Sequence, residues 1–198
     1  MNAEDREDLD IEFDMLLDDV AELKRRLVDD GPRLLTEACR ELSDVEPTLE
    51  ARVDGLLKRV EVVTERLETH STQLRSLARE RRGRLTGVST AVQDIGLSLQ
   101  SMIHLLDAQV EWLRDELTRL EQLKTAAGWQ PAAPQGQTPV QRVLSWISGL
   151  RAQLKKVGGM LWNIIALLLT PKQWTLKGEL GTGVLGLFNA GIEIQFGP

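Results

Sequence analysis

Apolar residues recur in alternating steps of four and three along most of this chain, which is the pattern of helices that pair through a heptad seam. The stretch from about residue 4 to residue 29 shows this spacing first, at Leu9, Phe13, Leu16, Val20, Leu23 and Leu27. Asp30, Gly31 and Pro32 follow it. Glycine and proline together are typical of a helix end, so we expect the first helix to stop there.

The most regular seam lies in the next stretch of the chain. We interpret it as the seam of a homo-oligomer, formed by Val53, Leu56, Val60, Val63, Leu67, His70, Leu74 and Leu77. Leu35, Leu42 and Leu49 continue the same seven-residue row upstream, so the phase is kept across Pro47. Because a turn need not preserve the register, the pattern predicts that Pro47 is a kink or short break inside one long rod, with Ser43 or Asp44 as a cap.

A third helix is expected from about residue 88 to residue 127. Its seam shifts partway along, from the row of Val92 and Leu99 to the row of Val110 and Leu117. Such a stutter widens the apolar face, so this helix should contact two neighbours. Thr90 and Gln93 have the spacing of a capping box at its start. Only a few residues separate it from the second helix, which predicts an antiparallel hairpin.

The last third of the chain begins with a Pro- and Gly-rich linker at residues 128–139. A further heptad seam runs from Val140 to Leu168 and stops at Pro171. After that the apolar spacing changes to alternation, which predicts a small β-hairpin containing Val184, Phe188, Ile192, Ile194 and Phe196. The expected fold is therefore mainly α. It is a long antiparallel coiled coil or helical bundle (residues 1–127), a linker (128–139), and a basic apolar helix with Gly-rich strands (140–198).

Charge divides the chain into two unlike parts. The total is −6, but residues 138–198 hold six bases and two acids, a net charge of +4, which leaves −10 for the rest. A strongly acidic body disfavours nucleic acid, because phosphate binding needs clustered cations. A basic tail of high apolar content favours an anionic membrane surface. We therefore expect protein partners for the acidic coiled coil, an anionic membrane as a partner for the tail, and no nucleic acid.

The single cysteine and the N-terminus bear on the compartment. Cys39 has no second cysteine with which to form an internal disulfide. The acidic N-terminal residues do not resemble a secretory signal peptide. We expect a cytoplasmic protein, with the inner face of the membrane as its site if the tail binds lipid.

Candidate catalytic groups are isolated in this sequence. Di-iron helical bundles use a glutamate three residues before a histidine, but Leu67 and Ser101 stand at those positions before His70 and His104. Cys39 falls on a seam, where a small buried role is expected. The chain has no phosphate-binding loop and no Cys-x-x-Cys pair. We expect no enzyme activity, no metal and no cofactor.

The tail carries the clearest functional signal. A nearly uncharged run at residues 157–169 has cations on both sides and indoles spread around it, as at a membrane interface. Thirteen helical residues rise only about 20 Å, which is too short for an ordinary span. The residues expected to contact a membrane or a partner are Trp146, Lys155, Lys156, Met160, Leu161, Trp162, Ile165, Leu168 and Trp174.

Two functional hypotheses follow. In the first, the protein is a homo-oligomeric coiled-coil scaffold or effector whose C-terminal helix and β-hairpin engage a membrane surface or insert partially. In the second, it is a wholly soluble coiled-coil adaptor whose tail packs on the bundle or adds a strand to a partner protein.

Overall fold

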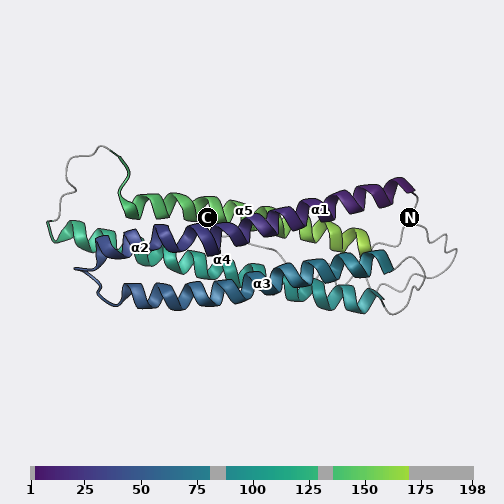
Figure 1. Ribbon diagram of the computed structural model, residues 1–198, viewed down its shortest axis with the longest axis horizontal. Coiled ribbons are helices and arrows are strands. Elements are labelled where there is room, and N and C mark those ends of the chain that lie inside the picture. Colours follow the sequence, from purple (N-terminus) through teal and green to yellow (C-terminus); the bar gives the residue numbers. More distant parts are fainter. Residues whose placement is uncertain (1–2, 81–87, 129–135, 170–198) are drawn as a thin grey trace, which may run out of the picture.

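The computed structural model describes residues 3–80, 88–128 and 136–169, and these residues are almost entirely helical (Figure 1). The elements in chain order are α1 (Ala3–Arg25), the π-helical turn η1 (Arg26–Asp30), α2 (Gly31–Leu42), α3 (Leu49–Glu80), α4 (Val88–Ala126) and α5 (Pro139–Leu169). The prediction of a mainly α helical bundle is confirmed for this part of the chain. The predicted β-hairpin, with Val184, Phe188, Ile192, Ile194 and Phe196, lies outside the described residues.

The first long helix continues through Gly31 and Pro32, so the prediction that it ends there is wrong. Arg25 and Gly31, on either side of η1, both keep right-handed helical dihedral angles. The Gly31 N–H donates to the carbonyl of Arg26, five residues earlier. Proline lacks an N–H and its ring collides with the carbonyl four residues before it in a regular α-helix. A wider π-helical turn just before Pro32 accommodates both features, so α1, η1 and α2 form one continuous helix.

Pro47 lies in a chain reversal, so its interpretation as a kink is also wrong. The N–H groups of Val45 and Glu46 both donate to the Leu42 carbonyl at 3.0 Å, which closes α2. The chain then turns and α3 runs back beside α1, where Lys24 and Glu68 form an ion pair at 2.8 Å. The heptad phase is the same before and after the turn because α2 and α3 both direct their apolar seams into one shared core.

The helices form an up-down-up-down bundle in which α5 closes the ring. Successive long helices are antiparallel, and α5 packs between α4 on one side and the α1–α2 helix on the other (Figure 1). The buried apolar residues form a single core to which every long helix contributes, for example through Phe13, Leu67, Leu106 and Leu161. The four long helices therefore share one hydrophobic interior.

Local capping sets the two ends of the α4–α5 connection. Gly128 adopts a positive φ of 84° just after α4, and its N–H donates to the Thr125 carbonyl at 3.0 Å. Thr138 and Gln141 form a reciprocal capping box at the start of α5, with bonds of 3.1 and 3.3 Å. The capping box expected at Thr90 is not placed to start α4, because that helix already begins at Val88.

Candidate binding groove

The structure separates the residues expected at a membrane or partner into two groups. Leu161, Ile165 and Leu168 are buried in the bundle core, and Trp146 and Met160 are half-buried against it. Lys155, Lys156 and Trp162 are on the surface, and Trp162 is 42% exposed. Trp174 lies outside the described residues. Most of the apolar surface of the α5 seam is therefore covered by the other helices of the same chain.

The cations of α5 face acids on the neighbouring helices. Arg151 bonds to Asp107 at 3.1 Å and to Glu111 at 2.5 Å, both on α4. The hydrogen bond to Asp107 raises the pKa of Arg151 above its ordinary value. On the other side, Lys156 lies 2.8 Å from a carboxylate oxygen of Asp19 on α1. The basic character of α5 is therefore used to pair with the acidic helices of its own bundle.

A polar lock and a close contact fix α5 against the first helix near η1. Arg26 donates to the Gln153 side-chain oxygen at 3.0 Å, and Gln153 donates to the Asp19 carbonyl at 3.1 Å. A Cβ atom at Gly31 would lie 3.1 Å from the Trp146 ring. The absence of a side chain at Gly31 therefore lets the indole pack directly on the helix backbone.

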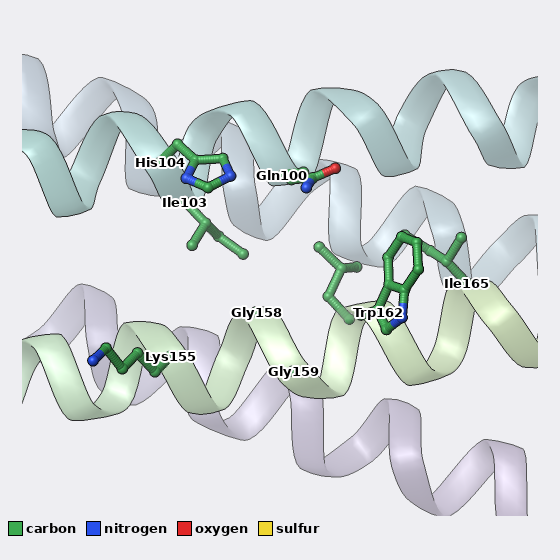
Figure 2. Close-up of a pocket in the computed structure, with 9 residues that line it drawn as sticks. Gln100, Ile103, His104, Lys155, Gly158, Gly159, Trp162 and Ile165 are labelled. Carbon is green, nitrogen blue, oxygen red and sulfur yellow. The ribbon is translucent and has the colours of Figure 1, made fainter. Parts of the chain in front are cut away.

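A groove opens between α4 and α5 toward the C-terminal end of α5 (Figure 2). It encloses about 180 Å³, and its walls are mostly apolar. Ile103 projects from α4 toward α5, and the indole of Trp162 stands beside Ile165 on the opposite wall (Figure 2). The groove thus presents aliphatic surface next to an exposed aromatic ring.

Two adjacent glycines on α5 create the open space. A Cβ atom at Gly159 would meet nothing within 4 Å, and one at Gly158 would lie 3.8 Å from Ile103. At one end of the groove the helices approach closely, because a Cβ atom at Gly96 would lie only 2.7 Å from the tip of Ile165. The groove is therefore a stretch where α5 presents backbone instead of side chains.

The polar part of the groove is neutral or basic. Gln100 and His104 on α4, and Lys155 on α5, are its polar lining residues, and none of the lining residues is acidic. His104 belongs to no metal site, since the described ranges contain no group of three or more His, Cys, Asp or Glu side chains that could hold an ion. The arrangement suits binding of an apolar group that carries a negative charge.

The predicted oligomer seam of α3 faces the interior of its own chain. Val53, Leu56, Val60, Leu67 and Leu74 are buried in the core. The remaining members are only partly buried, namely Val63, His70 and Leu77.

Polar and small residues of α3 occupy the buried positions directly after Val63, His70 and Leu77. Thr64, Ser71 and Ala78 are buried, and the two hydroxyls donate to the carbonyls of Val60 and Leu67. An α-helix drifts by about 20° per heptad relative to a 3.5-residue repeat, so its buried face moves to the next position. A search for apolar residues alone misses Thr64 and Ser71 for that reason.

Cys39 is buried in α2, with 5% of its surface exposed. Burial raises the pKa of its thiol to about 11, and the nearby Glu50 carboxylate adds to this effect. The thiol is therefore protonated at neutral pH and unsuited to nucleophilic chemistry.

Comparison of the chain with protein-family models, with curated proteins and with solved structures finds no significant match. Among the described helices, none combines the length and the apolar character needed to cross a membrane.

Proposed function

We propose that this protein is a non-enzymatic adaptor or scaffold that binds a polypeptide through the groove between α4 and α5. The observation that carries the proposal is the exposed indole of Trp162 beside an apolar groove, where Gly158 and Gly159 leave the backbone of α5 uncovered. Tryptophan is enriched among the residues that dominate protein interfaces, especially next to well-packed pockets. The groove is a natural place for the apolar side chains of a partner helix.

The size of the groove favours side chains over a free metabolite. Pockets for small molecules usually enclose about 300–1,000 Å³, whereas this groove encloses about 180 Å³. It also lies open along the boundary of two long helices, so a helical partner could run along it. Occupation by one or two large side chains matches both its volume and its shape.

A membrane surface is the second candidate for the same region. Trp162 and Lys155 lie two turns apart on the same face of α5, and an indole near a cation is typical of a membrane interface. The other apolar side chains of this helix turn mainly into the core, however, which limits the area available to lipid.

Site-specific photocrosslinking tests the proposal. A benzophenone amino acid at Gln100, on the groove, is activated in cells that produce the full chain, and the adducts are identified by mass spectrometry. The same measurement is made with Gly159→Leu, which places a side chain in the open space of the groove. Gly55→Leu is the matched control, because a Cβ atom at Gly55 on α3 would meet only the Arg59 guanidinium, at 3.7 Å.

The expected result is a polypeptide adduct that Gly159→Leu reduces at least tenfold and that Gly55→Leu leaves unchanged. Adducts with lipid alone would favour the membrane candidate and contradict the proposal. A polypeptide adduct that persists in Gly159→Leu would also contradict it, because the partner would then lie outside the groove.

A further inference from the structure

The outward face of α1 carries an apolar and acidic stripe. Ile11 and Met15 are 52% and 50% exposed, one helical turn apart, on the side opposite the buried residues of α1. Asp18 and Glu22 follow on the same face, at the spacing of helical turns. We call Ile11, Met15, Asp18 and Glu22 the α1 stripe. Exposed large apolar residues side by side on a helix are typical of a contact surface.

The α1 stripe and the groove have complementary chemistry. The stripe combines aliphatic side chains with carboxylates, whereas the groove combines apolar walls with Lys155 and His104 and has no acid. Opposite potentials of this kind favour association of the two surfaces.

Their spacings also agree. Ile11 and Asp18 are seven residues apart, which is about 10 Å along a helix, and Trp162 and Lys155 are separated by the same seven residues. In an antiparallel alignment, Ile11 lies beside Trp162 while Asp18 faces Lys155. Met15 then lies opposite the glycine pair, where the backbone of α5 is open. Methionine is an adaptable filler of such irregular spaces.

We infer that the groove binds the α1 stripe of a second copy of this chain. The inference rests on the proposed function, because it names the polypeptide that occupies the same groove. The stripe lies on the outer face of α1, whereas the groove lies between α4 and α5. The contact therefore joins two unlike surfaces, so assembly gives rings or open chains in which each copy uses both.

Charge reversal at each surface tests the inference on the purified full chain. Lys155→Glu disables the groove and keeps the stripe, and Asp18→Lys disables the stripe and keeps the groove. Molar mass is measured by light scattering over a range of concentrations for each variant, for their equimolar mixture and for the double variant. Lys58→Glu reverses an exposed lysine on α3 and serves as the control. Thermal unfolding verifies that each variant keeps the helical fold.

The wild-type chain and Lys58→Glu are expected to exceed twice the 22.2 kDa of one chain at high concentration. Each single reversal should remain monomeric. Their mixture should assemble like the wild-type chain, because the intact stripe of one variant meets the intact groove of the other, and the reversed stripe meets the reversed groove. The double variant should assemble again, since reversing the charge on both surfaces restores opposite charges across the contact.

A wild-type chain that stays monomeric at all concentrations overturns the inference. So does assembly of either single variant alone to the wild-type mass, or a mixture of the two that stays monomeric. These results are separate from the crosslinking test. An adduct with a different polypeptide at Gln100 would leave the adaptor function standing while the second copy is rejected as its partner.

Discussion

Replacing Leu150 with alanine tests whether α5 is an integral part of the bundle core. Leu150 is 0% exposed, and it lies in the core in the first half of α5. The substitution removes three carbon groups, worth about 0.8 kcal/mol each on transfer from water. The cavity left behind adds a further cost, and buried Leu→Ala changes typically lower the free energy of unfolding by about 2.7–5 kcal/mol. We expect a loss of about 3 kcal/mol.

Leu167→Ala on the same helix is the matched control, because Leu167 is 41% exposed. Its expected loss is below about 1 kcal/mol, as for other surface substitutions. Both free energies of unfolding are measured by urea denaturation at 25 °C, followed by circular dichroism. The slope of the free energy of unfolding against urea concentration should be equal for the two variants, since unfolding exposes the same surface area in both.

Similar small losses for Leu150→Ala and Leu167→Ala would refute this reasoning. That result would mean that α5 does not share the cooperative core of the other helices. A second transition, seen only for Leu150→Ala, would have the same meaning, because α5 would then unfold independently.

Three further predictions concern single side chains. Cys39 should react with iodoacetamide at neutral pH at least a hundredfold more slowly in the folded chain than in urea, because it is buried and its raised pKa of about 11 keeps the thiol protonated; equal rates would contradict its burial. The hydrogen bond from Arg119 lowers the pKa of Glu116 in the folded chain. The ionised Glu116 carboxylate therefore stabilises the fold above its unfolded pKa of about 4.3, and this stabilisation is lost as pH falls through the lower pKa of the folded state. Glu116→Gln should therefore lose less stability than wild type between pH 6 and pH 3 in urea titrations, and an unchanged acid sensitivity would count against this. Thr64→Val should raise the free energy of unfolding by up to about 1 kcal/mol, because the Thr64 hydroxyl bonds only to carbonyls of its own helix. A decrease in the free energy of unfolding of more than about 1 kcal/mol would show that the hydroxyl is needed.

The helices were largely predictable from the sequence, but the path of the chain at Gly31 and Pro32 and at Pro47 was not. Apolar periodicity reports which face of a helix is buried, so it located α3, α4 and α5. It does not report whether the chain turns, because two antiparallel helices with one core keep the same phase across Pro47. It also does not reveal how a helix accommodates Gly31 and Pro32, since the π-helical turn is a backbone geometry that many sequences can adopt.

The candidate site was only partly predictable for a related reason. An apolar run with flanking cations looks the same whether it faces lipid or a protein core. Leu161, Ile165 and Leu168 were expected at a surface but are buried in the core, and of the three only Leu161 and Ile165 border the groove. Trp162 was expected as a contact residue and lies on the surface, at the groove. The groove itself depends on the orientation of Gly158 and Gly159 toward α4, which the packing of the bundle decides.

The lock between α5 and the first helix has a consequence for the kinetics of folding. This lock consists of the hydrogen bonds that Gln153 makes with Arg26 and Asp19, together with the ion pair between Lys156 and Asp19. These contacts join positions that are 127 to 137 residues apart in the chain. Contacts of such long sequence separation cost the most loop entropy and tend to form after local hairpins. Loss of the lock should therefore accelerate unfolding far more than it slows folding. The pairing that closes the ring would then set how long the native bundle survives, while the earlier hairpins set how fast it forms.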